Sequence, residues 1–278
     1  MLGAWGHPLT SADVTDELVH LAVDSGVATI TLDSPANRNA LSARLRRELR
    51  DHLTTTAHDD ATRVVVLSHT GPVFCAGMDL KESRGAGSSD QGVNEFPQIL
   101  ELIWTHPKPV VARLAGPARA GGVGIVAACD IAVASDEVSF AFTEVRIGVV
   151  PAVISVTVLP RVLPRAAHEL FLTGETFDAR RAAAVGLINS AVPRERLDDE
   201  VRRYTGLLAL GGPTALAATK AMLRRPRAAS MADDFAAMLE LSARHFAGQE
   251  GQEGIRAFAD RRPPSWVPAP TSGHVDNG

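Results

Sequence analysis

Two glycine-containing segments and one glutamate are the parts of this sequence best suited to chemistry. Residues 114–130, LAGPARAGGVGIVAACD, pass from an expected strand through a Gly-Gly pair into an apolar run with a helical pattern. Residues 74–80, FCAGMDL, leave another apolar strand in a similar way, and Gly77 there permits an unusual backbone angle. Each exit can present an unpaired backbone N–H, at Gly121 and at Met78, because amides at a helix start have no acceptor within the helix.

Two such amides aimed at one point form an oxyanion hole, which holds a thioester oxygen as it gains negative charge. Taken alone, either segment is better explained as a tight turn whose glycines serve packing. Glu144 supplies the third part, in the apolar segment FAFTEVRIG. Burial there would raise its pKa and suit proton transfer, whereas the alternative is a surface glutamate paired with Arg146. Together the three parts favour stabilisation of an enolate or a tetrahedral oxyanion.

The remaining candidate residues point to little further chemistry. Arg38, in the segment SPANRNALS, is a candidate phosphate contact, although isolated arginines usually have no specific role. The histidines show no metal-ligand spacing, so we expect no metal site. Cys75 and Cys129 lie in apolar runs and are expected to be buried free thiols. The sequence has no G-x-S-x-G elbow and no Walker loop.

Composition favours one large α/β domain with an appended piece. The chain has 278 residues, is 45% hydrophobic with 5% aromatics, and carries a net charge of −4. This charge argues against a nucleic-acid partner, whose binding rests on neutralising phosphates. No apolar run reaches the length of a membrane span, and the N-terminus lacks a secretory pattern. We therefore expect a cytoplasmic protein without a membrane partner.

Periodicity predicts short strands that alternate with helices over the first two thirds of the chain, which indicates α/β layering. Strands are expected at 17–24 and 27–33, joined as a hairpin, and at 63–68, 109–114, 131–134 and 187–192. Ser42 is the expected cap of a helix with Leu45, Leu49 and Leu53 on one face. Further helices are expected at 98–105, 123–129, 153–162, 165–172, 178–185, 195–210, 213–224, 231–246 and 253–261. Residues 81–94 are expected to form a mobile loop, and 139–151 an irregular segment.

The motifs, taken in order, resemble the enoyl-CoA hydratase/isomerase (crotonase) superfamily from about Glu17 to Trp266. They are SPANRNALS, VFCAGMDLKE, AGPARAGGVGIVAACDIAVAS, FAFTEVRIGVVPA, LTGETFDARRAAAVGLIN and EGIRAFADRR. The resemblance implies a spiral of repeated ββα units, placed at 16–200, and then a helical trimerisation region at 201–262. Residues 1–15 and 263–278 are expected to be a flexible arm and a disordered tail. Homotrimers, or hexamers made from them, are also implied.

The same resemblance implies roles for particular residues. The Met78 and Gly121 amides would form the oxyanion hole for an acyl-CoA thioester, and Glu144 would be the catalytic carboxylate. Coenzyme A would then be part of the substrate, with no separate cofactor. Contacts to CoA or the acyl group are implied for Arg38, Ala40, Ala76, Asp79, Leu80, Gly124 and Phe258.

One position departs from the pattern that the resemblance implies. Family hydratases typically hold a water between two glutamates, and the first of these falls at Gly124. Hydration of a 2-enoyl-CoA with Glu144 as the sole acid and base is our first choice. An isomerase that moves a 3-enoyl double bond, and a non-catalytic acyl-CoA binder, are alternatives. A methylglutaconyl-CoA-type hydratase is another; Arg119 or Arg146 would then bind a substrate carboxylate, although solvent exposure of Arg119 is the more favoured reading.

Overall fold

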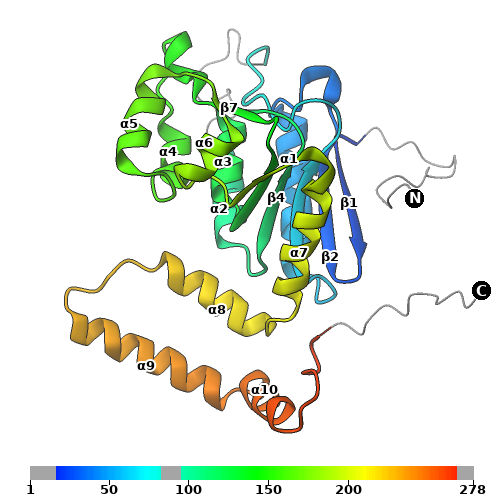
Figure 1. The fold of residues 1–278 in the computed structure, drawn as a ribbon, viewed down its shortest axis with the longest axis vertical. Coiled ribbons are helices and arrows are strands. Elements are labelled where there is room, and N and C mark those ends of the chain that lie inside the picture. The colour runs from blue at the N-terminus through cyan, green and yellow to red at the C-terminus, as the bar shows by residue number, and fades with distance from the viewer. Residues whose placement is uncertain (1–16, 83–94, 268–278) are drawn as a thin grey trace, which may run out of the picture.

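A six-stranded sheet forms the centre of the computed structural model, which describes residues 17–82 and 95–267 (Figure 1). Its order is β1-β2-β3-β4-β6-β9, antiparallel between β1 and β2 and parallel elsewhere. The strands are β1 (Val19–Asp24), β2 (Val27–Leu32), β3 (Val64–His69), β4 (Val110–Leu114), β6 (Ile131–Ser135) and β9 (Ser190–Val192). The predicted hairpin and the α/β layering are therefore confirmed, and the pairing after β2 is parallel.

A smaller sheet lies beside the ends of these strands, and together the two sheets form the repeated unit of two strands and a helix. It contains β5 (Ala118–Arg119), β7 (Ser139–Ala141) and β8 (Phe177–Asp178), and a bridge from Cys75 to Ala118 joins it to the exit from β3. The chain thus runs from the large sheet to the small one and then into a helix, once through β4 and β5 and again through β6 and β7. Residues 139–151 were expected to be irregular, but they contain β7 and a 3-10 helix. The sequence did not indicate β7 because a strand of three residues is too short to show an alternating pattern.

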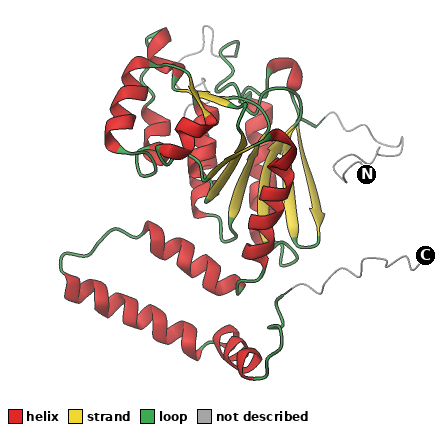
Figure 2. Cartoon of the chain, viewed as in Figure 1, coloured by secondary structure: helices red, strands yellow, loops and turns green. Residues whose placement is uncertain are grey.

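Helices cover both faces of the large sheet (Figures 1 and 2). In β3, Val65 and Leu67 face the main core, whereas Val64 and Val66 pack in a second cluster against Leu197 of the covering helix. This alternation explains the continuous apolar run of the strand, which is buried on both faces. The main-core helices are α1 (Ala43–His58), α2 (Phe96–Thr105), α3 (Gly121–Ala128), α4 (Ala152–Val158), α5 (Pro164–Thr173) and α6 (Ala179–Ala184).

The helix on the opposite face is α7 (Leu197–Ala209), which straddles the predicted domain boundary at residue 200. It packs on β3, β4 and β6 and so belongs with the sheet. The C-terminal region, which we define as α8 (Pro213–Arg224), α9 (Met231–Ala247) and α10 (Gln249–Ala259), projects from the sheet layers (Figure 1). The predicted cap of α1 is confirmed, since Ser42 accepts a hydrogen bond from the Leu45 amide.

Part of the predicted disordered tail instead contacts the body of the protein. The Trp266 indole donates a hydrogen bond to the Leu210 carbonyl at 3.1 Å. Arg63 donates to the carbonyls of Trp266 and Gly211. Residues 263–267 are therefore ordered by their tryptophan, a contact that composition alone did not indicate. The predicted arm at 1–15, the remaining tail and residues 83–94 of the predicted mobile loop lie outside the described residues.

No single helix within residues 17–82 and 95–267 is long and apolar enough to cross a membrane. Residues 194–209 and 213–224 meet the length and composition test only as a pair, bent by 106°. The predicted cytoplasmic location stays a prediction.

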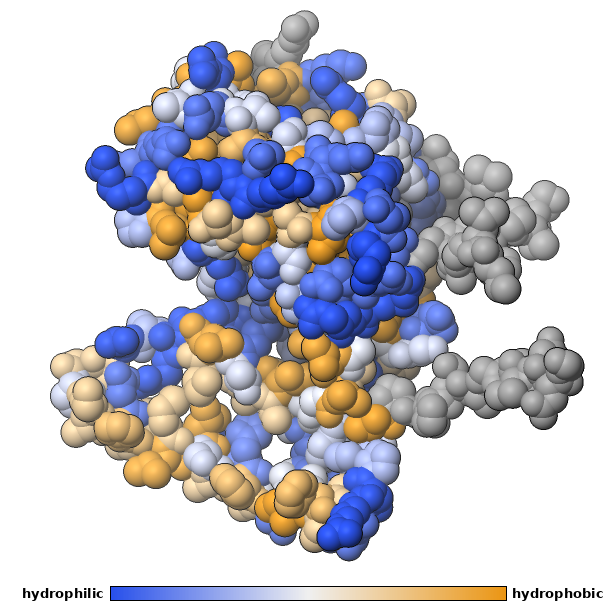
Figure 3. Space-filling model, viewed as in Figure 1, coloured by the Kyte–Doolittle hydropathy of each residue, from blue (hydrophilic) through white to orange (hydrophobic). Residues whose placement is uncertain are grey.

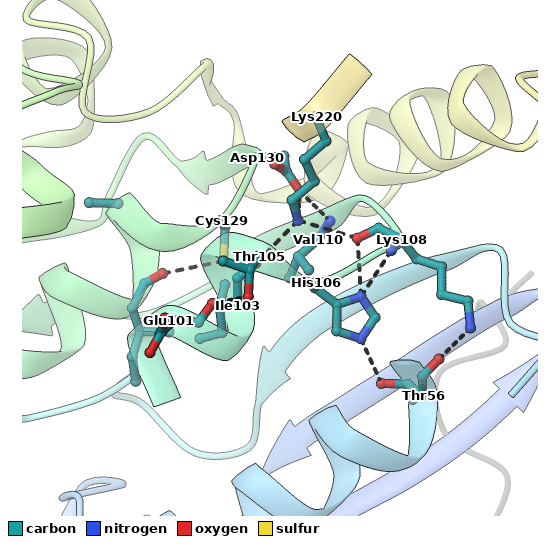
Figure 4. Close-up of polar contacts among 12 residues, drawn as sticks. Thr56, Glu101, Ile103, Thr105, His106, Lys108, Val110, Cys129, Asp130 and Lys220 are labelled. Atoms are coloured by element: carbon teal, nitrogen blue, oxygen red, sulfur yellow. Dashed lines mark hydrogen bonds and ion pairs between the residues drawn. The ribbon is translucent and has the colours of Figure 1, made fainter. Parts of the chain in front are cut away.

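A buried lysine joins the C-terminal region to the sheet domain (Figure 4). Lys220 of α8 has 7% of its side chain exposed and lies 2.6 Å from a carboxylate oxygen of Asp130. Its ammonium also donates to the carbonyls of Ile103 and Lys108. The same Asp130 oxygen accepts from the Val110 amide at 2.8 Å. One ammonium thus connects α8 to the residues that follow α2 and α3.

Replacing Lys220 by methionine is expected to lower the free energy of unfolding by about 3 kcal/mol, because Asp130 loses its partner at a mostly buried position. Urea unfolding followed by circular dichroism measures this change. The double variant Lys220→Met/Asp130→Asn should recover part of the loss. In contrast, Arg244→Met, which breaks an exposed pair with Glu240, should change the value by about 0.5 kcal/mol or less. Equal losses at the two sites would contradict this account of the junction.

Candidate active site

The two glycine-containing exits meet at Gly77. This residue has a φ of +91°, and a Cβ placed on it would lie 2.9 Å from the Ala120 Cβ and 3.3 Å from the Gly121 nitrogen. Gly122 is equally constrained, since a Cβ there would lie 2.6 Å from the Cys75 carbonyl oxygen. The Arg119 amide donates to that carbonyl at 2.9 Å. The glycines therefore serve close backbone packing, and this packing brings the two exits together.

Both predicted oxyanion amides are available for a ligand. Gly121 is the first residue of α3, so its N–H has no acceptor within the helix. The Leu41 amide donates to the Gly77 carbonyl at 2.8 Å and holds the other exit in place. Within the described ranges, neither the Met78 nor the Gly121 amide donates to a protein acceptor. Ala120, which precedes α3, has a φ of +46°, a strained conformation of the kind that clusters at functional sites.

Met78, Gly121 and Glu144 line one cavity of about 410 Å³. Most of its wall is apolar and comes from the exit after β3, the start of α2 and the segment between Glu144 and α4. The full set of lining residues is Ala76, Met78, Leu80, Phe96, Ala120, Gly121, Thr143, Glu144, Ile147, Val149, Val150, Pro151, Ala152, Val153 and Ile154. The structure therefore brings together three segments that are distant in sequence, since Met78 and Gly121 are about forty residues apart and Gly121 and Glu144 about twenty.

Glu144 lies in a 3-10 helix, Thr143–Ile147, which ends at Gly148 in the left-handed conformation. Its Oε2 atom is buried and has no hydrogen-bond partner among the described residues. Burial raises the pKa of Glu144, and a hydrogen bond from its own backbone amide offsets part of this rise. Arg146 is exposed, and no ion pair joins it to Glu144. The carboxyl group is thus placed for proton transfer, not for a surface ion pair.

Gly124, predicted as a substrate contact, does not line the cavity. It is buried in α3, and a Cβ there would lie 2.6 Å from the Ile154 Cγ2 atom. Thr157 of α4 donates to the Gly124 carbonyl at 3.1 Å, which fixes the two helices at this separation. Ile154 therefore takes the space that a longer side chain at position 124 would need, and presents an apolar wall to the cavity.

The other predicted CoA contacts divide into two groups. Ala76 and Leu80 line the cavity. Arg38, Ala40 and Asp79 do not line it but lie next to it in the fold: the Arg38 carbonyl accepts from the Ala76 amide, and Asp79 contacts Asn37. Phe258 is 89% exposed on α10 and does not line the cavity. The roles of these residues in binding CoA stay predictions.

Neither arginine considered for a substrate carboxylate faces the cavity. Arg119 is half-buried, and its guanidinium donates to the Ser139 carbonyl at 2.6 Å and the Ser139 hydroxyl at 2.8 Å. The expectation of solvent exposure is therefore wrong, because this side chain cross-links β5 and β7. Arg146 is exposed and also absent from the cavity wall. The described lining contains no Lys, Arg or His, which favours an uncharged acyl group.

Asn39 is a supporting residue that the sequence analysis missed. It is fully buried with a φ of +52°. Its side-chain amide donates to the carbonyls of Thr70 and Val73, and its oxygen accepts from the Ser34 amide. These bonds hold the loop before α1 against the exit from β3. Asparagine tolerates positive φ more readily than most residues. An asparagine between a turn and a helix cap was therefore the sequence feature that could have identified this supporting residue.

The sequence and the fold are similar to those of known proteins. A family model described as enoyl-CoA hydratase/isomerase matches residues 22–268. The rat protein "Enoyl-CoA hydratase domain-containing protein 3, mitochondrial" is 36% identical over 87% of this chain and 81% of its own length. Carnitinyl-CoA dehydratase of Proteus mirabilis is 32% identical over 89% of this chain and 97% of its own. The crystal structure of an enoyl-CoA hydratase from Mycobacterium smegmatis superposes with a TM-score of 0.84 at 32% identity, covering 90% of this chain and 99% of that one.

Substituting Gly124 by alanine is expected to lower the free energy of unfolding by about 1–3 kcal/mol, because the added methyl group meets Ile154. Denaturant titration measures the loss. Ile154→Leu keeps the side-chain volume but removes the β-branch, so the double variant should be more stable than the sum of the two single effects. Strict additivity of the two changes would contradict the contact.

Glu144→Gln tests the burial of the carboxyl group through pH. Because the folded-state pKa is raised, the folded chain binds this proton more tightly than the unfolded chain, and wild-type stability falls as the pH rises through the raised pKa. The glutamine variant lacks this loss. Its Tm should exceed the wild-type value at pH 8, and the difference should shrink as the pH falls to 4. A difference that grows on acidification would refute the assigned burial.

Proposed function

This chain belongs to the enoyl-CoA hydratase/isomerase (crotonase) superfamily, and from that premise we propose that it adds water across the double bond of a 2-enoyl-CoA thioester. The observation that carries the proposal is the meeting of two free backbone amides, at Met78 and Gly121, with the buried carboxyl of Glu144 in one cavity. The names of the two relatives refer to CoA thioesters, enoyl-CoA in one and carnitinyl-CoA in the other.

The thioester oxygen accepts hydrogen bonds from the Met78 and Gly121 amides. As a nucleophile adds to C3, the electron pair moves through C2 onto this oxygen and forms an enolate. The two amides are fixed by the backbone before the reaction, so they stabilise the developing charge without reorganisation. The loss of one such donor typically costs about 3–4 kcal/mol of transition-state stabilisation. The polarised thioester is itself the electron sink, so this reaction calls for no metal or redox cofactor.

Glu144 makes both proton transfers, and the same proton is carried in each. As a carboxylate it takes one proton from a water molecule, while the water oxygen forms its bond to C3 and the enolate forms. The protonated Glu144 then delivers that proton to C2, the enolate collapses to the thioester, and the carboxylate is regenerated. A raised pKa suits this role because the group must hold a proton and release it at neutral pH.

A second candidate is the isomerase, and the contact of Gly124 with Ile154 favours it. No carboxylate stands at position 124, so Glu144 alone must orient any attacking water. Moving a proton from C4 to C2 of a 3-enoyl-CoA needs a single base and no water. The methylglutaconyl-CoA-type reaction has less support, since no basic side chain of the described residues lines the cavity. The non-catalytic binder gives no reason for the buried, unpartnered Oε2 atom of Glu144.

The C-terminal region supports assembly into homotrimers, with hexamers as pairs of these. Apolar side chains gather over the projecting helices (Figure 3). The large exposed ones are Met222, Leu223, Met231, Phe235, Leu239, Phe246, Ile255 and Phe258. Such a large apolar surface is typical of an interface between protein chains. In this assembly Phe258 would approach a CoA bound by a neighbouring copy.

Glu144→Gln is expected to reduce kcat by about 10²–10⁴-fold with little change in the Kd for a CoA thioester, because the amide cannot transfer the proton. The measurement uses crotonyl-CoA, a 3-enoyl-CoA and methylglutaconyl-CoA as substrates. Glu175→Gln, an exposed glutamate outside the cavity, is the matched control and should keep wild-type rates.

The wild-type substrate panel separates the candidates. Turnover of crotonyl-CoA supports hydration, and turnover of the 3-enoyl-CoA alone supports the isomerase. Tight binding of all three CoA thioesters without turnover would exclude the hydratase and the isomerase and support a non-catalytic acyl-CoA binder. Full activity of Glu144→Gln on any substrate would exclude the mechanism described here.

A further inference from the structure

A second cavity lies next to the catalytic one. It has a volume of about 610 Å³ and lies between α2 and α4. Its walls are Pro97, Leu100, Glu101, Trp104 and Thr105 of α2, with Ala152, Val153, Val156 and Thr157 of α4. Ala152 and Val153 also line the catalytic cavity, so the two spaces share a wall. We call this second cavity the α2–α4 groove.

The groove runs along both helices and away from the catalytic carboxyl group. Its α2 residues are spaced three, four, seven and eight positions after Pro97, which is one face of a helix. The starts of both helices line the catalytic cavity, through Phe96 and Ala152. At 1.5 Å per residue, the face from Pro97 to Thr105 is about 12 Å long.

The groove has an apolar floor that is held in place. Leu100 is 3% exposed, and the Trp104 ring is covered on one face by the Arg161 guanidinium at 4.6 Å. Arg161 is itself fixed by hydrogen bonds to the carbonyls of Ala127 and Cys129. Opposite the floor, Val156 is 73% exposed and has no cover among the described residues.

The polar groups of the groove do not recruit a charged ligand. The Thr157 hydroxyl already donates to carbonyls within and beside α4. Glu101 and Thr105 are exposed at the rim, and no basic side chain appears among the lining residues. The chemistry of this space therefore fits an alkyl chain and opposes a second carboxylate.

We infer that the α2–α4 groove holds the distal part of a medium- to long-chain, unsubstituted acyl group whose thioester lies at Met78 and Gly121. This inference rests on the proposed function, since it places the acyl-CoA thioester in the catalytic cavity. An extended polypeptide spans about 3.5 Å per residue with three backbone bonds, which is about 1.2 Å per bond. An extended alkyl chain advances by a similar distance per bond. The groove then takes roughly ten bonds beyond the first carbons, which favours acyl groups of about twelve to fourteen carbons.

Calorimetric binding of saturated acyl-CoAs tests this inference independently of the reaction, because these ligands are not turned over. We expect dodecanoyl-CoA to bind the full chain at least tenfold more tightly than butanoyl-CoA, with a more negative heat-capacity change from apolar burial. Dodecanedioyl-CoA, which ends in a carboxylate, should bind about tenfold more weakly than dodecanoyl-CoA.

A substitution in the groove supplies the second arm. Val156→Glu should remove most of the gain from the longer chain, lowering the ratio of the two affinities to near one. Leu172→Glu places the same charge on a leucine of α5 that is 75% exposed and outside both cavities, so its ratio should stay at the wild-type value.

The outcomes separate the two proposals. If no acyl-CoA of any length binds, the proposed function fails together with this inference. If butanoyl-CoA and dodecanoyl-CoA bind equally well, only the groove assignment is overturned. It is likewise overturned if Val156→Glu leaves the ratio unchanged but alters the mass of the assembly in solution, since the groove would then be a contact between copies of the chain.

Discussion

The close contact between the two strand exits is the constraint on which the active site depends. Gly77 fits against Ala120 and Gly121 only because it has no side chain, and Gly122 fits against the Cys75 carbonyl for the same reason. A methyl group at either glycine would push apart the exit after β3 and the start of α3. The Met78 and Gly121 amides would then no longer line a single cavity. Backbone packing, and not a polar side chain, therefore sets the geometry at which the two free amides meet.

Much of this arrangement could be predicted from the sequence, because it follows from local rules. Alternating and continuous apolar runs located the strands, Ser42 located the start of α1, and the two glycine exits with Glu144 located the cavity. The remainder depends on contacts between distant residues. Ile154 against Gly124, the Arg119 link to Ser139 and the docking of Trp266 leave no periodic signal in the residues around them.

The position of Glu144 shows how the surroundings of a carboxyl group decide its chemistry. Glu48 of α1, beside the edge strand β1, accepts two backbone N–H bonds and a bond from Arg44, and its pKa is lowered. Glu144 has an unpartnered oxygen in an apolar wall, and its pKa is raised. The same side chain is thus suited to anchoring the backbone in one place and to proton transfer in the other.

The packing of Ile154 on Gly124 also has an evolutionary consequence. In a lineage carrying this pair, a single substitution that places a carboxylate at position 124 is unfavourable, because the space is already filled from α4. The neighbouring helix would have to change first, at a position where the change alone opens a void beside the cavity. Two individually unfavourable steps therefore separate the one-carboxylate site from a two-carboxylate site. Such a site diversifies more readily through its acyl-binding walls than through its acid–base groups.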